Sequence, residues 1–277
     1  RNMLVLEYDD QLLVIDAGLM FPNNDMYGVD VVIPDMSYVF DRADQVVGIV
    51  ITHAHEDHIG ALHHLLARVH APVYATPLTR GFIEIRLREA HLTEVELSTI
   101  KPRDSWSLGP FGVECFHMSH SIPDGIGLAI QTPLGVVVHS GDFKFDHNPV
   151  DGQRSDFARL AELGERGVLL LLSDSTNAET HGYTPSEKAM EENLRAVFSK
   201  ANGRVLVAMF ASNISRVQQV VDISREFGRH VAVVGKSMVN NIRIARELGY
   251  LNFGSEALVT LGQIDGMPAR EITIIYT

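Results

Sequence analysis

The first 180 residues alternate between short apolar runs and polar breaks, a pattern that predicts β-strands with few helices. Residues 3–8 and 12–16 are two such runs, and the three polar residues between them predict a hairpin. Residues 46–52 predict a third strand, which leads through a polar stretch into an amphipathic helix near residues 59–69. The other elements expected here are a helix at 77–91, a strand at 113–118, a hairpin at 128–140 and a buried strand at 168–173.

After residue 180 the pattern changes to a strict alternation of helices and strands. We predict a helix from Pro185, strands at 205–210 and 231–235, and helices near 214–227 and 238–248. Such alternation is typical of a parallel α/β sheet.

A start signal marks the first helix of this second part. Thr184 suits the N-cap, Pro185 suits the first helical position, and Glu187 completes a capping box. We therefore predict two domains, at residues 1–179 and 180–277. The last expected strand has no helix after it, so we expect the second domain to continue further.

Composition places the chain among globular proteins. With 277 residues and 45% hydrophobic content, it can bury a large core. Its single cysteine, Cys115, cannot form an intrachain disulfide, and no apolar run approaches the roughly 20 residues of a membrane helix. We expect a cytoplasmic protein with no membrane partner. No methionine precedes Arg1 and Asn2, so we expect the start of the chain to be trimmed.

The net charge of −12 argues against a nucleic-acid partner, because phosphate binding depends on basic surfaces. The charge is unevenly distributed. Residues 179–277 carry 11 basic and 10 acidic side chains, whereas residues 1–178 carry 12 and 25. Several acids of the first part are candidate metal ligands whose charge a bound cation would offset. The objection to a nucleic-acid partner is therefore weak.

The strongest chemical signal is the segment 52–58, which places three imidazoles and two carboxylates directly after a predicted strand. His53 and His55 can face one metal ion while Asp57 and His58 turn toward a second, and these nitrogen and oxygen donors suit zinc. The plain alternative is a solvated polar loop. Clustered imidazoles repel one another when protonated, so we favour the metal site.

Two later segments supply further candidate ligands at strand ends. His120 would complete the first metal position, and Asp142, with two carboxylate oxygens, would bridge both positions. Taken singly, His120 could be a hydrogen-bonded surface residue and Asp142 a turn residue after a glycine. His117 is the rival for the third ligand, but residues three apart on a strand face opposite ways, so only one of the two can face the metals.

These segments resemble known families. Residues 53–58 resemble the HxHxDH signature of metallo-β-lactamase-fold hydrolases, and residues 13–18 resemble the strand of that fold that ends in a supporting acid, here Asp16. A wider set of segments resembles the ribonuclease J family of β-CASP nucleases: residues 28–30, 33–35, 120–124, 140–146 and 173–177. Asp174 matches the acid that ends the last strand before the inserted β-CASP domain. Each of these two acids could otherwise be an ordinary turn or cap residue.

The resemblance implies an α/β fold: a metallo-β-lactamase αββα sandwich followed by a partial parallel α/β β-CASP domain. It implies two Zn²⁺ ions per full-length chain, with Mn²⁺ as the alternative. Their ligands would be His53, His55, Asp57, His58, His120 and Asp142. Asp16 and Asp174 would support them through hydrogen bonds to the ligand imidazoles. The last His ligand of the second zinc is expected after Thr277, so the 277 residues alone would hold that ion weakly and be close to inactive.

Residues 210–216 also resemble the β-CASP domain, and they carry the candidate substrate contacts Ser212, Asn213 and Arg216. Ser212 and Asn213 precede a predicted helix, so capping is an equal alternative. Arg216 could reach a phosphate, although a solvated position on the helix is the simpler interpretation.

The implied function is a zinc-dependent ribonuclease that hydrolyses RNA phosphodiesters as a 5′–3′ exonuclease and endonuclease, in RNA maturation, including ribosomal RNA processing, and in RNA decay. The implied partner is single-stranded RNA with a 5′-monophosphate, and the full-length protein is expected to form a homo-oligomer. The alternatives are a two-zinc thioester or lactone hydrolase, another β-CASP nuclease acting on DNA or pre-mRNA, and a non-catalytic scaffold with a vestigial zinc site.

Overall fold

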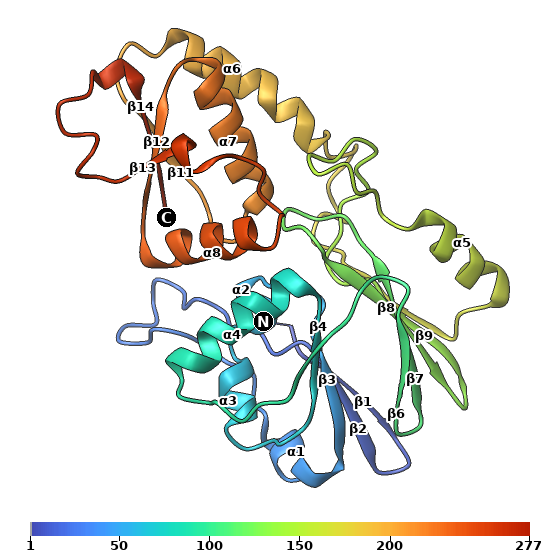
Figure 1. Cartoon of the computed structure of the whole chain (residues 1–277). Helices are drawn as coiled ribbons and strands as arrows, with labels where there is room; N and C mark the ends of the chain where they lie inside the picture. Colours follow the sequence, from blue (N-terminus) through green and yellow to red (C-terminus); the bar gives the residue numbers. More distant parts are fainter. Residues whose placement is uncertain (1) are drawn as a thin grey trace. The chain divides into compact units, whose positions relative to one another are not determined.

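The computed structural model describes residues 2–277, and Arg1, with which the first predicted domain begins, lies outside them. The chain forms two compact units (Figure 1). The first comprises the chain up to His120 together with Asp124–Phe143 and Ser155–Thr180, and the second comprises Ser121–Pro123, Lys144–Arg154 and His181–Thr277. The division into domains at residues 1–179 and 180–277 stays a prediction.

The first unit contains a five-stranded sheet in the order β1-β2-β3-β4-β5. The strands are β1 (Leu4–Tyr8), β2 (Gln11–Ile15), β3 (Val46–Val50), β4 (Val73–Ala75) and β5 (Leu97–Thr99). The predicted hairpin is confirmed: β1 and β2 pair antiparallel, and Asp9 and Asp10 between them have φ of 51° and 60°, as a tight two-residue loop requires. The other neighbouring pairs are parallel.

A second sheet follows in the order β10-β9-β8-β7-β6. Its strands are β6 (Ser105–Leu108), β7 (Phe111–His117), β8 (Ile126–Thr132), β9 (Gly135–His139) and β10 (Leu170–Leu172). Side chains of both sheets share one core; Leu13, Ile15 and Val50 of the first sheet pack with Cys115 and Leu128 of the second. The alternating burial along β7 is the expected pattern for a strand with one face in this core.

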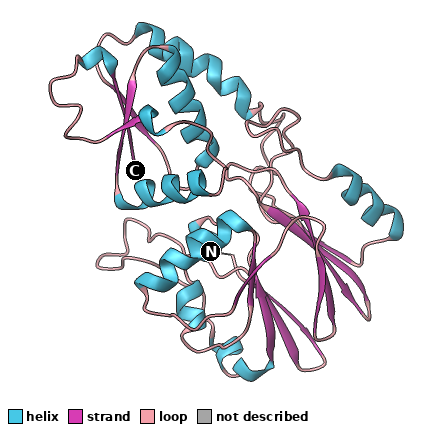
Figure 2. Cartoon of the chain, viewed as in Figure 1, coloured by secondary structure: helices cyan, strands magenta, loops and turns pink. Residues whose placement is uncertain are grey.

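Helices cover the outer faces of this sandwich (Figures 1 and 2). The first sheet carries α1 (Ser37–Phe40), η1 (Ala43–Gln45), α2 (Glu56–Ile59), α3 (Leu62–Leu66) and α4 (Pro77–Glu89). The second sheet carries α5 (Phe157–Arg166), whose Leu163 packs against Phe116 and Val138. The predicted αββα sandwich is therefore confirmed.

Two predictions for this unit are wrong in detail. The single helix expected near residues 59–69 is the pair α2 and α3, because the N–H of Ala61 donates to the carbonyl of Ala17, 2.8 Å away, and interrupts the helical ladder. Residues 168–173 were expected to be buried, but Leu170 and Leu171 are 46% and 60% exposed. Within the described residues β10 pairs only with β9, so it is an edge strand, which an apolar run alone does not reveal.

The second unit is the predicted parallel α/β sheet, in the order β11-β14-β12-β13. Its strands are β11 (Val205–Ala208), β12 (His230–Val234), β13 (Leu258–Val259) and β14 (Ile272–Tyr276). Its helices are η2 (Glu187–Ala189), α6 (Met190–Lys200), α7 (Ile214–Glu226), α8 (Lys236–Glu247), η3 (Ser255–Ala257) and η4 (Ala269–Glu271). None of the helices described for residues 2–277 has the length and apolar character needed to cross a membrane.

The predicted N-cap of the first helix lies two residues too early in the chain. Ser186, rather than Thr184, is the N-cap, and its hydroxyl oxygen accepts the N–H of Lys188 at 3.2 Å. Asp146 determines this start, because its Oδ2 accepts both the Ser186 hydroxyl, at 3.0 Å, and the N–H of Glu187, at 2.8 Å. Asp146 lies 40 residues earlier in the chain, so the local capping pattern could not indicate it.

Candidate metal centre

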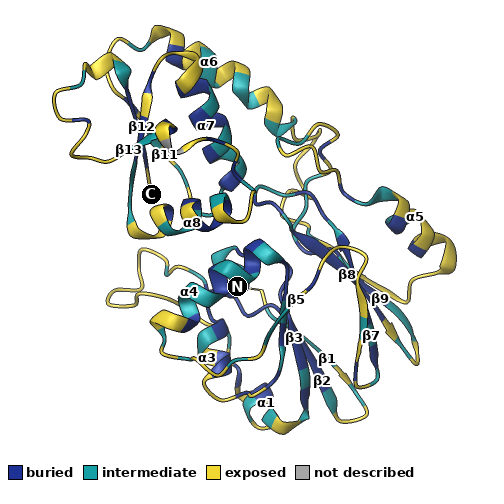
Figure 3. Ribbon diagram, viewed as in Figure 1, coloured by how far each residue is buried: buried dark blue, intermediate teal, exposed yellow. Residues whose placement is uncertain are grey.

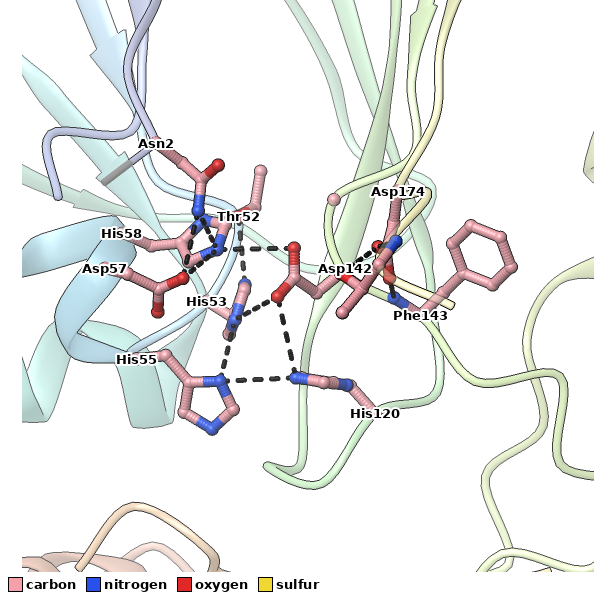
Figure 4. A network of polar contacts seen from close by, with 12 residues as sticks. Asn2, Thr52, His53, His55, Asp57, His58, His120, Asp142, Phe143 and Asp174 are labelled. Carbon is pink, nitrogen blue, oxygen red and sulfur yellow. Dashed lines mark hydrogen bonds and ion pairs between the residues drawn. The ribbon is translucent and has the colours of Figure 1, made fainter. Parts of the chain in front are cut away.

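Four strand ends of the first unit deliver His and Asp side chains to one place (Figure 4). The residues follow β2, β3, β7 and β9: Asp16; His53, His55, Asp57 and His58; His120; and Asp142. The strands β2 and β3 are parallel neighbours buried along nearly their whole length, so their carboxyl ends open at the same edge (Figure 3). The carbonyl of Thr52 accepts the N–H of Ile126 at 3.0 Å, which joins this edge to the second sheet.

A tight turn presents Asp142. Gly141 before it has φ of 61°, and a Cβ there would lie 2.6 Å from the carbonyl oxygen of Ile126. Only glycine fits such a turn without strain. The N–H of Gly141 donates to Nδ1 of His139, 3.1 Å away, which holds the turn in place.

The first group of candidate ligands is His53, His55, His120 and Asp142. Nδ1 of His55 lies 3.1 Å from Nε2 of His53 and 3.2 Å from Nε2 of His120, and Oδ2 of Asp142 lies 3.9 Å from both Nε2 atoms. Four ligands at about 2.05 Å from a tetrahedral zinc ion stand about 3.3 Å apart. The spacing of these four atoms therefore fits one such ion.

Burial favours the neutral form of the imidazoles in this group. Burial, together with the neighbouring imidazoles, lowers the pKa of His53 and of His120 below the ordinary value and lowers that of His55 to about 3. Neutral imidazoles keep a lone pair for a metal ion, so this group needs no proton loss before it binds one.

The second group is Asp57, His58 and Asp142. Nε2 of His58 lies 3.3 Å from Oδ1 of Asp142 and 3.6 Å from Oδ2 of Asp57. Asp142 therefore directs one oxygen to each group, which is the geometry of a bridging carboxylate. These three atoms leave room for further ligands in the coordination of an ion.

Asp16 fixes the orientation of His58. Its carboxylate is buried, and Oδ2 accepts from Nδ1 of His58 at 2.7 Å and from the hydroxyl of Thr52 at 2.8 Å. Oδ1 accepts the N–H of Thr52 at 2.8 Å. Because Nδ1 of His58 carries the proton in this contact, Nε2 is the atom turned toward Asp142.

Asp174 hydrogen-bonds to the backbone, and its negative charge opposes the effect of burial, which lowers the pKa of His120. Its Oδ2 accepts the N–H of Phe143 at 3.3 Å, and its Oδ1 accepts the N–H and hydroxyl of Thr176 at 2.9 and 2.7 Å. Its own N–H donates to the hydroxyl of Ser140 at 2.9 Å. These contacts brace the turn that carries Asp142, and the supporting role of Asp174 toward a ligand imidazole stays a prediction.

His120 lies in the first group, whereas its rival His117 does not belong to either group in the described residues. Thr52 and Asn2 are two residues of the centre that sequence reasoning missed. Thr52 was part of the His-rich segment but had no assigned role. For Asn2 the local sequence carries no signal, because its partners lie 55 and 56 residues later.

The candidate substrate contacts lie in the second unit. Oδ1 of Asn213 accepts the N–H of Arg216 at 3.1 Å and so caps α7, which Ser212 precedes by one further residue. The guanidinium of Arg216 donates to Oε2 of Glu187 at 2.6 Å. The capping role is thus present, and contact of these residues with RNA stays a prediction.

His58 makes the affinity of the second group pH-dependent. Burial lowers the pKa of His58, but the carboxylates of Asp16 and Asp142 outweigh it and raise the pKa to about 10. An ion must therefore displace a proton at neutral pH, and its affinity should increase about tenfold per pH unit between pH 6 and 8. The affinity of the first group for its ion should depend much less on pH. Competition titrations with a metal indicator over this range measure both, and equal slopes for the two ions would contradict the assignment.

Comparison with known proteins agrees with this geometry. Residues 14–162 match the Beta-lactamase superfamily domain, and the chain belongs to that superfamily. Residues 202–277 match the Ribonuclease J, beta-CASP domain. The resemblance to ribonuclease J predicted from the sequence is thereby confirmed.

Curated relatives match along the whole chain. It is 46% identical to Ribonuclease J of Synechocystis sp. over 100% of this chain and 44% of the relative. It is 44% identical to Ribonuclease J of Helicobacter pylori, over 100% of this chain and 40% of the relative. It is 41% identical to Ribonuclease J2 of Bacillus subtilis, over 99% of this chain and 50% of the relative. The chain thus spans about half the length of these relatives or less.

One solved structure shares the fold. A protein of unknown function from Enterococcus faecalis V583 superposes with a TM-score of 0.66 over 99% of this chain and 73% of its own. The two sequences are 14% identical, so the likeness concerns the fold alone.

Proposed function

We propose that this chain is the catalytic part of a zinc-dependent ribonuclease. The observation that carries the proposal is the pair of ligand groups joined by Asp142, which offers Oδ2 to one group and Oδ1 to the other. The RNA substrate is inferred from the match of residues 202–277 to the β-CASP domain and from the relatives named Ribonuclease J. Imidazole and carboxylate donors favour zinc, with manganese as the alternative.

The residues of the centre have different roles in this proposal. Two bound zinc ions would supply Lewis-acid chemistry to a phosphodiester and its attacking water. His53, His55 and His120 would hold the first ion with neutral nitrogens, and Asp57 and His58 would contribute to the second. Asp142 would serve both positions. Asp16, Thr52 and Asp174 keep these side chains and the turn before Phe143 in place, so that the ligands do not reorganise during the reaction.

The remaining parts of the proposal rest on the resemblance to the ribonuclease J family. We propose 5′–3′ exonuclease and endonuclease action on single-stranded RNA with a 5′-monophosphate, in RNA maturation and decay in the cytoplasm, by a homo-oligomer of the intact protein. The β-CASP match favours this activity over hydrolysis of thioesters or lactones.

The test compares substrates and metals in the intact protein. RNA with a 5′-monophosphate, single-stranded DNA, a thioester and a lactone are incubated with the untreated enzyme, the chelated enzyme and the chelated enzyme resupplied with Zn²⁺ or Mn²⁺. RNA cleavage that disappears on chelation and returns with metal is the expected result. Metal-dependent turnover of the thioester or lactone with RNA left intact would overturn the proposal. Bound metals without turnover of any substrate would instead support a vestigial site.

A further inference from the structure

Asn2 lies against the second ligand group (Figure 4). Its side-chain nitrogen is 3.0 Å from Oδ2 of Asp57 and 2.9 Å from Nε2 of His58. Both residues belong to the second group, and these two atoms lie 3.6 Å apart. An amide nitrogen is a donor only, and a carboxylate oxygen has lone pairs for both a hydrogen bond and an ion, so the amide can direct Asp57 without coordinating an ion itself.

The backbone holds Asn2 in this position independently of its side chain. The N–H of Asn2 donates to the carbonyl of Asp57 at 2.7 Å, and the carbonyl of Asn2 accepts the N–H of Gly18 at 2.9 Å. Asn2 therefore joins the segment after β2 to the start of α2. Replacement of the side chain leaves both of these hydrogen bonds available, which allows the role of the amide to be tested separately.

Asp57 is the ligand that most needs such a restraint. Its side chain is 47% exposed, whereas those of Asp142 and His58 are 29% and 2% exposed. An exposed carboxylate has rotamer freedom that it must lose when it binds an ion, and a hydrogen bond that selects one rotamer beforehand lowers this cost. His58 already has its Nδ1 directed by Asp16, so its orientation does not depend on Asn2.

We infer that Asn2 is a positioning residue for the second metal ion, which it serves by orienting Asp57. The inference rests on the proposed two-metal function. It assigns Asn2 no part in the first group, because the side-chain hydrogen bonds described for Asn2 go to Asp57 and His58.

The experiment measures the two metal affinities separately. The intact protein, stripped of metal, is titrated with Co²⁺ and followed by visible absorption, with a competing chelator to bring both affinities into range. Asn2→Ala removes the amide, and Asn2→Leu removes it while keeping a branched side chain of similar shape. Asn24→Ala is the matched control, because Asn24 is exposed in the loop after β2. Thermal unfolding of the metal-free proteins is measured alongside.

Both Asn2 variants should bind the second Co²⁺ about 10- to 100-fold more weakly, which is the effect expected when a group that orients a ligand is removed. The affinity for the first Co²⁺ and the Tm of the metal-free protein should stay as in the control. Unchanged second-site affinity would overturn the inference, and so would a parallel loss of both affinities and of Tm, because that is the behaviour of a structural anchor. If the unmodified protein bound only one Co²⁺, the two-metal proposal itself would fail.

Discussion

Replacement of Asp142 by alanine should weaken the binding of both metal ions and reduce the rate of RNA cleavage by about a thousandfold or more. The reason is the shared carboxylate: Oδ2 stands 3.9 Å from the imidazole nitrogens of His53 and His120, and Oδ1 stands 3.3 Å from that of His58. Metal contact with a reacting phosphate is worth several kcal/mol, and about 1.4 kcal/mol corresponds to a factor of ten in rate. Metal content after dialysis and the initial rate of RNA cleavage measure the two effects.

Asp25→Ala is the control for loss of a negative charge, because Asp25 is exposed in the loop after β2. It should retain both metals and its rate. Asp142→Asn keeps the shape and one neutral oxygen, so it should lose less metal than Asp142→Ala. Two tightly held ions in Asp142→Ala would show that the carboxylate does not bridge the two groups.

Gly18→Ala should lower the occupancy of the second metal position and destabilise the fold. An added Cβ would lie 1.6 Å from the carbonyl oxygen and 2.0 Å from the carbonyl carbon of Asp57, and 2.7 Å from the nitrogen of His58. All three are backbone atoms, so no side-chain rotation relieves the overlap. The segment after β2 and the start of α2 must separate, which displaces two ligands of the second group. Overpacking of this kind costs about 1–3 kcal/mol.

The Tm of the metal-free protein and its metal content after dialysis measure this effect. Gly203→Ala is the matched control, since nothing lies within 4 Å of a Cβ built there. It should behave like the unmodified protein. Gly18→Ala with unchanged Tm and two retained metals would mean that the two segments can separate without disturbing Asp57 and His58.

The sequence allowed the main outline of the fold to be predicted because its periodicities are strong. The hairpin of β1 and β2, the second-unit parallel sheet and the segments that bring His53, His55, His120 and Asp142 together could all be inferred from apolar runs and polar strand ends. The pattern of segments predicted the family. These features depend on residues that are near one another in the chain or that belong to a recognisable motif.

The predictions that failed depend on distant contacts. The helix near residues 59–69 is divided by a hydrogen bond to Ala17, and the start of η2 is set by Asp146. The contacts of Asp174 with Phe143 and of Asn2 with Asp57, which were not predicted, also join residues far apart in the chain. Strand order and loop contacts bring these residues together, and neither can be predicted from the local pattern of apolar and polar residues.

The single carboxylate between the two ligand groups also means that the metal positions are thermodynamically coupled. If an ion in one position changes the affinity of the other by some factor, the second ion must change the affinity of the first by the same factor. An ion bound by the first group would order the Asp142 carboxylate that a second ion would use, while the two positive charges would oppose each other. Occupancy of this centre is therefore a joint property, and a dissociation constant assigned to one position has meaning only for a stated occupancy of the other.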